Sequence, residues 1–547
     1  VYALRDRGHD NLYALTVGQK APVRLTNTPA DDQSPAWSPD GTKIAFASHR
    51  DGNWELYVMD VASGNTSRLT YDLAYESAPT WSPDGKFIAY EGYQNNNLDI
   101  YIVASDGSGN PIRLTQNPAP DYSPAWSPDG RHIAYVSLRE GSAQVYVIDL
   151  NSPIEDKALR LTSEQDVDAQ SPVWSPNGSQ IAYSARVNGL DEVFTKTVAQ
   201  PNADPVVVGQ GRDPAWSPNG ASLIFAVDSI TASGATSTLI SGQVGNFGVS
   251  ALAYTLKGRV SHPSWTGNNT SIPAAMQQNG GVKPLDDKPL YTEVIHYQAD
   301  KPPYFKLAQL SGVTAPNPYL SDKVDDSFVA LRAAIVQRAG FDFLGNLQDA
   351  LWAQDRPPEP GQSRQSWHYG GRAFDFDKNL VFGSPSPIEV VREDSGVNTL
   401  WRVYIRVPEE LQGGQLGEPL KRLPWDFASR SSGDPQTFEN GGRTKASVPA
   451  GYYVDFTEIA QDYAWMPVPS GRDWRRNYSS ILYWEFDKNE GLSWTEAMLQ
   501  LYSQDDLNAF LNGPTPLPVP IAASTATPDR GPTRTPTPIP PDAKSGH

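Results

Sequence analysis

The sequence predicts a multidomain protein in which an all-β propeller is followed by an α+β domain and an extended tail rich in proline and threonine. Three observations predict this organisation: a turn motif recurs through the first half, the repeat stops at about residue 289, and proline dominates the final segment. At 547 residues the chain is too long for one ordinary hydrophobic core. We expect the propeller at 1–275, a linker at 276–288, the α+β domain at 289–512 and the tail at 513–547.

The turn motif reads Trp-Ser-Pro followed by Asp or Asn and then Gly, and its copies are spaced 44, 45, 48, 42 and 49 residues apart. The copies begin at Trp37, Trp81, Trp126, Trp174, Trp216 and, in a decayed form, Trp265. Proline sets φ at the first corner, the Asp or Asn side chain caps the turn, and glycine adopts the positive φ that ends it. Tryptophan is then free to pack between blades. The spacing is typical of four-stranded propeller blades.

Strand-like segments follow each clear turn in a constant order. The first turn is followed by Lys43–Ala47, Glu55–Met59 and a short Arg-Leu-Thr segment, Arg68–Thr70. This pattern resembles the TolB-type propeller, and the resemblance covers about residues 1–275. Propellers support both enzymes and docking platforms, so the resemblance implies protein binding only as an expectation.

The chain begins in the middle of a blade, because residues 1–4, 11–17 and 23–26 read as strands two to four without a first strand. A closed ring therefore needs a donor strand, and the segment Val260–Trp265 can supply it. This pairing favours six blades. A seventh blade, or a strand donated by another subunit, stays open because Thr270–Met276 also has a weak strand pattern.

The second domain is predicted to mix helices and strands. Ser321–Ala339 reads as an amphipathic helix that ends at Gly340. The other expected elements are strands at 341–344, 401–407 and 481–486, a proline-rich loop at 356–361, and helices at 494–501 and 505–511.

One segment of this domain carries a chemical motif: Ser366–Asp375 spells S-x-H-x-x-G-x-A-x-D. The motif resembles the zinc-binding motif of the D-alanyl-D-alanine carboxypeptidase family of bacterial cell-wall peptidases. The resemblance implies that His368 and Asp375 are zinc ligands. In that family a late E-x-W-H-W-E-type segment supplies a third ligand histidine, and its first glutamate is the base. The corresponding stretch here has Tyr483 in place of the histidine and Ser480 in place of the base.

Histidine is scarce, because the chain has seven and only His547 follows His368. A third ligand would have to be His296, a propeller histidine, or a carboxylate such as Glu485 or Asp487. We therefore expect a degenerate peptidase domain without catalysis or a bound cofactor, in which His368 and Asp375 hold a turn by hydrogen bonding. The alternative is an active zinc enzyme whose site contains His368, Asp375 and Glu485.

Composition narrows the classes of partner and location. The net charge of −18 and a pI near 4.8 argue against nucleic acid and anionic membrane surfaces. The absence of cysteine excludes disulfides, cysteine-ligated zinc and thiol catalysis. The chain lacks an apolar run long enough for a transmembrane helix and begins with Val1, so we expect a secreted product at the cell surface or outside the cell, with the periplasm as an option.

These observations favour a secreted, non-catalytic surface or filament-forming protein that assembles as a homo-oligomer. The tail, with ten prolines and six threonines in residues 513–547, would contact a neighbouring subunit or anchor the chain. One alternative is a zinc carboxypeptidase acting on cell-wall peptides. Another is an envelope scaffold that binds peptidoglycan or another envelope protein. Eight of the 15 tryptophans lie in residues 352–494, which suggests sugar stacking or core packing.

Overall fold

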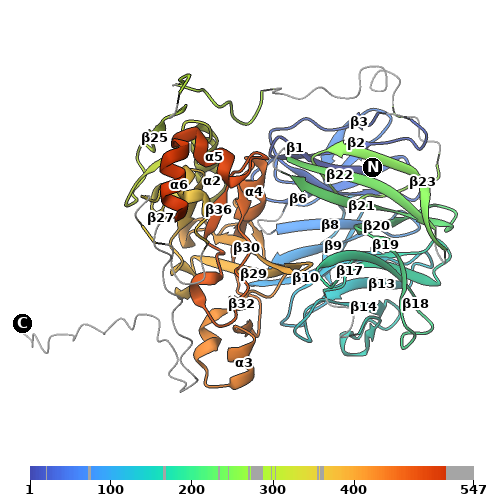
Figure 1. Ribbon diagram of the computed structural model, residues 1–547. Coiled ribbons are helices and arrows are strands. Elements are labelled where there is room, and N and C mark those ends of the chain that lie inside the picture. The colour runs from blue at the N-terminus through green and yellow to red at the C-terminus, as the bar shows by residue number, and fades with distance from the viewer. Residues whose placement is uncertain are drawn as a thin grey trace, which may run out of the picture.

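A computed structural model describes residues 1–512 of the chain except for short gaps. The gaps are residues 20, 72–74, 164–167, 232–233, 244–245, 269–271, 273–287, 297, 302–303, 354–355 and 358–362. The N-terminal strands form a ring of sheets, and the second domain covers one side of that ring (Figure 1). The predicted tail contact at 513–547 lies outside the described residues.

The described part of residues 1–261 contains six four-stranded antiparallel sheets. In spatial order the first sheet is β24 (Arg259–Ser261), β1 (Tyr2–Asp6), β2 (His9–Ala14) and β3 (Val23–Arg24). The second is β4 (Asp32–Trp37), β5 (Lys43–Ser48), β6 (Glu55–Asp60) and β7 (Thr66–Arg68), and the third is β8 (Tyr75–Trp81), β9 (Phe87–Gln94), β10 (Asn97–Ala104) and β11 (Ile112–Arg113). The fourth is β12 (Asp121–Trp126), β13 (His132–Ser137), β14 (Gln144–Asp149) and β15 (Leu159–Arg160). The 3₁₀ turn η1 (Glu155–Lys157) lies between β14 and β15. The fifth is β16 (Gln170–Trp174), β17 (Gln180–Val187), β18 (Leu190–Thr197) and β19 (Val206–Gln210), and the sixth is β20 (Arg212–Trp216), β21 (Ser222–Thr231), β22 (Gly234–Gln243) and β23 (Asn246–Lys257).

The two ends of the ring join in the first sheet. Strand β24 pairs antiparallel with β1, and Val260 lies opposite Leu4. This pairing confirms that the segment near Val260 supplies the missing inner strand. Of the alternative strand Thr270–Met276, only Ile272 lies within the described residues.

The repeated turns have the predicted chemistry. In the first copy, Ser38 Oγ donates to Asp40 Oδ1 at 2.6 Å, and the backbone N–H of Thr42 donates to the same carboxylate oxygen at 3.0 Å. Gly41 follows with a φ of 71°. The motif tryptophan links neighbouring sheets, since Trp81 Nε1 donates to the carbonyl of Ala36 on the preceding sheet at 3.1 Å.

The short outer strands end two residues before the prediction. Strand β7 ends at Arg68, not at Thr70. The reason is that the Thr70 side chain replaces the backbone: Thr70 Oγ1 accepts from the N–H of Leu56 at 2.9 Å, and Arg68 Nε donates to the Thr70 carbonyl at 2.6 Å.

The second domain contains two four-stranded sheets. One has the order β27 (Leu347–Asp349), β28 (Ala373–Phe376), β36 (Glu485–Asp487) and β35 (Met466–Pro467), and the other β29 (Ile388–Ser395), β30 (Asn398–Arg406), β34 (Tyr452–Asp455) and β31 (Glu418–Pro419). Two smaller sheets pair β25 (Leu307–Gln309) with β26 (Tyr319–Ser321) and β32 (Trp425–Asp426) with β33 (Arg443–Thr444). The helices are α2 (Asp325–Ala339), α3 (Pro435–Glu439), α4 (Phe456–Asp462), α5 (Trp494–Leu501) and α6 (Gln504–Asn512). The 3₁₀ turns are η2 (Phe343–Gly345), η3 (Trp367–Gly370), η4 (Leu380–Phe382), η5 (Glu409–Leu411), η6 (Phe427–Ser431) and η7 (Tyr478–Ser480).

Two predicted elements of this domain differ in the structure. The second half of the segment predicted as strand 341–344 belongs to the turn η2, which places Phe343 against Phe376 with ring centroids 5.2 Å apart. The late strand is only β36, because η7 precedes it and Leu482 adopts a φ of 61°, which strand backbone does not allow. Every helix among the described residues is too short or too polar to cross a lipid bilayer.

The two domains contact each other through ion pairs and aromatic rings. Arg5 of β1 pairs with Asp462 at 2.7 Å, and Arg259 of β24 pairs with Glu458 at 3.1 Å. Tyr93 packs edge-on against a tyrosine of the second domain, and its hydroxyl accepts from the N–H of Gly451 at 2.7 Å. The interface is therefore both buried and charged.

Candidate functional site

The turn of the S-x-H-x-x-G-x-A-x-D motif is held by its own residues. The Ser366 side chain caps η3 by accepting from the backbone N–H of His368. Gly371 ends the turn with a φ of 60°, and a Cβ there would lie 2.8 Å from the backbone nitrogen of Ser321. The chain then enters β28, which carries Asp375. Ser and Gly of the motif are thus explained by local geometry.

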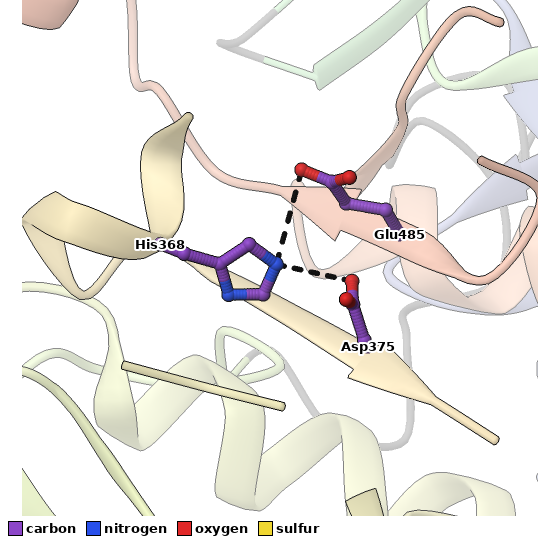
Figure 2. A group of neighbouring side chains, drawn as sticks. All are labelled: His368, Asp375 and Glu485. Carbon is purple, nitrogen blue, oxygen red and sulfur yellow. Dashed lines mark hydrogen bonds and ion pairs between the residues drawn. The ribbon is translucent and has the colours of Figure 1, made fainter. Parts of the chain in front are cut away.

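Three predicted residues meet in one buried cluster. His368 Nε2 lies 3.0 Å from Asp375 Oδ1 and 3.8 Å from Glu485 Oε1. Figure 2 shows the same ring nitrogen facing both carboxylates. The two acids lie side by side because Asp375 of β28 and Glu485 of β36 are directly paired in the sheet. The side chains are 0%, 2% and 7% exposed.

The imidazole ring is fixed from two further sides. Its other nitrogen, Nδ1, is hydrogen-bonded to the carbonyl of Ala350, so Nδ1 carries the proton and donates. Trp352 stacks flat on the ring, with centroids 4.6 Å apart and an interplanar angle of 8°. This arrangement leaves Nε2 directed at the acidic residues and covers one ring face with apolar surface.

The pKa values of the cluster show that it holds more buried carboxyl groups than the single imidazole can neutralise. Burial alone lowers the pKa of His368, but Asp375 and Glu485 outweigh it and raise this pKa to about 9. Burial, together with the charge of Asp375, raises the pKa of Glu485 to about 8. On the same strand, burial raises the pKa of Asp487 to about 7. In the buried cluster, carboxyl groups with raised pKa values outnumber the single imidazole.

The donor set fits a divalent metal ion. One ligand atom from each of His368, Asp375 and Glu485 lies within 4.8 Å of the other two. A ligand histidine whose second ring nitrogen donates to a backbone carbonyl is the usual arrangement at zinc sites, and Ala350 supplies that carbonyl. One imidazole and two carboxylates form an acceptable ligand set for zinc.

The other sequence candidates lie elsewhere. Tyr483, expected in place of the third ligand, directs its hydroxyl to the carbonyl of Lys378 and to Tyr478. Ser480 is buried within η7. His296 is exposed and pairs with Asp322 at 2.9 Å. Of the residues suggested as a third ligand, the sheet register therefore places Glu485 beside His368 and Asp375.

Comparison with known proteins shows the family of the first half of the chain. Residues 1–95 and 74–269 match the family described as TolB beta propeller domain. The N-terminal half is a TolB-like β-propeller. A search of the curated proteins found no match.

Among solved structures, the chain is similar to TolB from Acinetobacter baumannii, with 22% identity and a TM-score of 0.41, over 48% of this chain and 65% of that one. It is similar to a putative TolB from Agrobacterium tumefaciens, with 22% identity and a TM-score of 0.38, over 44% of this chain and 86% of that one. A chain of a nidogen/laminin complex has 11% identity and a TM-score of 0.39, over 48% and 95%. This chain thus spans less than two thirds of the length of the first of these.

Proposed function

We propose that this protein is a non-catalytic interaction protein of the cell envelope. Its propeller serves as a docking module, and its second domain is a degenerate D-alanyl-D-alanine carboxypeptidase-like domain. The observation that carries the proposal is the closure of the cluster: His368 is fully buried and stacked under Trp352. A catalytic metal site needs an open position for water and substrate, which this closure argues against.

The identity of one neighbouring residue supports the loss of catalysis. In the family pattern E-x-W-H-W-E the ligand histidine and the base correspond to Tyr483 and Ser480 of this chain. Ser480 is buried in η7. A serine hydroxyl does not take a proton from water as the carboxylate of the family's base does.

A zinc ion bound by His368, Asp375 and Glu485 would compensate the buried carboxylates and so stabilise the domain. In an active peptidase the same ion would act as a Lewis acid toward water and the peptide carbonyl. Whatever the occupancy, these side chains hold β28 and β36 to the turn η3.

The second candidate function is a zinc carboxypeptidase acting on cell-wall peptides. The observation that favours it is Asp487, whose pKa of about 7, raised by burial, lies in the range suited to a general base. Asp487 follows Glu485 by two residues on β36, so both side chains leave the strand on the same face.

One experiment separates the two functions. Metal content is measured on the full chain, and release of D-alanine is measured from a peptide ending in D-alanyl-D-alanine with added zinc. The first proposal expects no release above that of His368→Ala, whether or not zinc is bound. Release by the native chain that disappears in His368→Ala would overturn it and establish the peptidase.

We further infer a six-bladed ring, an envelope or extracellular location and assembly into homo-oligomers or filaments. The six sheets and the closure through β24 support the blade number. Deletion of residues 513–547 tests the assembly: light scattering should detect large particles only with the tail present. Large particles in both proteins would remove the tail from the explanation.

The third hypothesis is an envelope scaffold that binds glycan or protein, and the structure favours protein binding over glycan binding. Seven of the eight tryptophans in residues 352–494 are buried, so core packing accounts for them and sugar stacking does not. Protein docking by the propeller needs no such surface. Cosedimentation with peptidoglycan tests the glycan version, and we expect the chain to stay in the supernatant.

A further inference from the structure

A large polar cavity lies between the propeller and the second domain. Its volume is about 1060 Å³, and both domains contribute to its wall. Ion pairs such as Arg5 with Asp462 cross the interface that encloses it. Ligand pockets occur preferentially at domain interfaces, and a pocket of this size accommodates a small molecule. The buried cluster of His368, Asp375 and Glu485 does not line this cavity.

Three arginines of the cavity wall converge on one carboxylate, Glu393 of β29. Arg422 Nη1 donates to Glu393 Oε1 at 2.7 Å. The same oxygen lies 3.8 Å from Arg186 Nη1 and 3.9 Å from Arg402 Nε. Arg186 comes from propeller strand β17, whereas Arg402 comes from β30 of the second domain. Glu393 thus accepts a hydrogen bond from Arg422, whereas Arg186 and Arg402 lie beyond hydrogen-bond distance of it.

The other acidic neighbours of Arg186 and Arg402 do not accept a hydrogen bond from their Nε atoms. Asp191 lies 3.9 Å from Arg186 Nε, too far for a hydrogen bond. Asp455 forms an ion pair with Arg402 Nε at 3.1 Å, but the geometry does not make a hydrogen bond. Within the described ranges, both Nε atoms are buried and have no acceptor.

Buried Nε–H groups without an acceptor are costly in a protein interior. A buried donor that has left water without gaining an acceptor destabilises the fold. The Nε atoms themselves are buried, but the two side chains are 25% and 17% exposed and line the cavity, so an occupant can reach the exposed part of Arg186 and Arg402. Guanidinium groups are well suited to receive carboxylate or phosphate, because their N–H groups match the geometry of both anions.

We infer that the interdomain cavity binds a small anionic molecule whose carboxylate or phosphate group is received by Arg186 and Arg402. The ligand contacts both domains at once, because the two arginines belong to different domains. Its binding therefore stabilises the relative position of propeller and second domain.

The proposal is tested by calorimetric titration of the full chain with inorganic phosphate and, separately, with succinate, at matched ionic strength in chloride. Binding of phosphate alone or of succinate alone supports the site and identifies its class. Arg186→Gln should weaken the affinity about tenfold or more, as expected for loss of a charge-assisted hydrogen bond. Arg186→Lys, which keeps the charge without the fork, should lie in between.

The matched control is Arg476→Gln, which removes the same charge at a side chain that is 70% exposed and outside the cavity. The affinity of this variant for phosphate or succinate should equal that of the native chain. Absence of binding by both anions to the native chain overturns the proposal. So does an affinity that falls equally in Arg186→Gln and Arg476→Gln, since net charge would then be the cause. If Arg186→Gln fails to fold, the comparison of Arg186→Lys with the control decides in the same way.

Discussion

Replacing Glu485 by glutamine should stabilise the metal-free protein. Burial and Asp375 raise the pKa of Glu485 from an ordinary 4.5 to about 8. At pH 7 the folded state therefore keeps this carboxyl protonated, while the unfolded state ionises it. Stability contributed by such a group is present below pH 4.5 and is lost as the pH rises toward 8. Each pH unit corresponds to about 1.4 kcal/mol, so the loss at pH 7 is about 3 kcal/mol.

Glutamine has the shape of the protonated carboxyl but takes up no proton. We expect Glu485→Gln to raise the free energy of unfolding by about 2 kcal/mol in chelator, since the amide must still find partners in the cluster. With zinc, the native chain should instead have a higher free energy of unfolding than Glu485→Gln. A native site saturated at about 100 times Kd gains about 2.7 kcal/mol, and a neutral amide in place of a charged ligand forfeits most of it.

The assay is urea unfolding at pH 7, followed by tryptophan fluorescence, with chelator and then with zinc. The matched control is Glu439→Gln on α3, a 56% exposed glutamate paired with Arg476. It should change the unfolding free energy by less than about 0.5 kcal/mol in either condition. The reasoning is refuted if Glu485→Gln is destabilised in chelator by more than about 1 kcal/mol, or if zinc stabilises it as much as the native chain.

Three further predictions concern stability, each measured by urea unfolding. The metal-free protein should lose stability between pH 6.5 and 9, because the pKa of His368 is raised to about 9 in the folded state and its stabilising proton is lost over that window; His368→Gln should reduce the slope. Arg5→Ala should cost about 3 kcal/mol, since it leaves the carboxylate of Asp462 without its buried partner across the interface. Gly258→Ala should cost about 3 kcal/mol, because its φ is 102° and a Cβ would overlap the carbonyl of Arg5 at the ring closure. Gly234→Ala, with a similar φ of 111° and open space around the Cβ, should cost about 1 kcal/mol.

Outcomes that contradict these predictions are distinct. A metal-free stability that rises between pH 6.5 and 9 would mean that His368 is neutral in the folded protein. A loss below about 1 kcal/mol in Arg5→Ala would mean that the interface is not coupled to folding. Equal losses at the two glycines would show that backbone strain, and not the contact at the ring closure, controls the effect.

The repeat domain was predictable because its signals are local. Proline, Asp or Asn, and glycine in the turn act within five residues, and the structure has Gly41 at positive φ with Asp40 capping the turn. The late strand was less predictable, since its apolar run 481–486 contains Leu482 in a left-handed conformation. Periodicity does not reveal such a bend.

By itself, the sequence determined the repeat and the local motif that brings His368 and Asp375 together within eight residues. These features depend on turns and short-range capping, which neighbouring residues encode directly. The closure near Val260 is a long-range pairing, but it was predictable because the repeat leaves the first blade without its inner strand. The third member of the cluster was decided by the tertiary structure, because Glu485 joins it through the register of β28 with β36, strands more than 100 residues apart. The convergence of Arg186 and Arg402 was decided in the same way, by the docking of two domains. Contacts of this range depend on how whole sheets pack, and no local pattern records them.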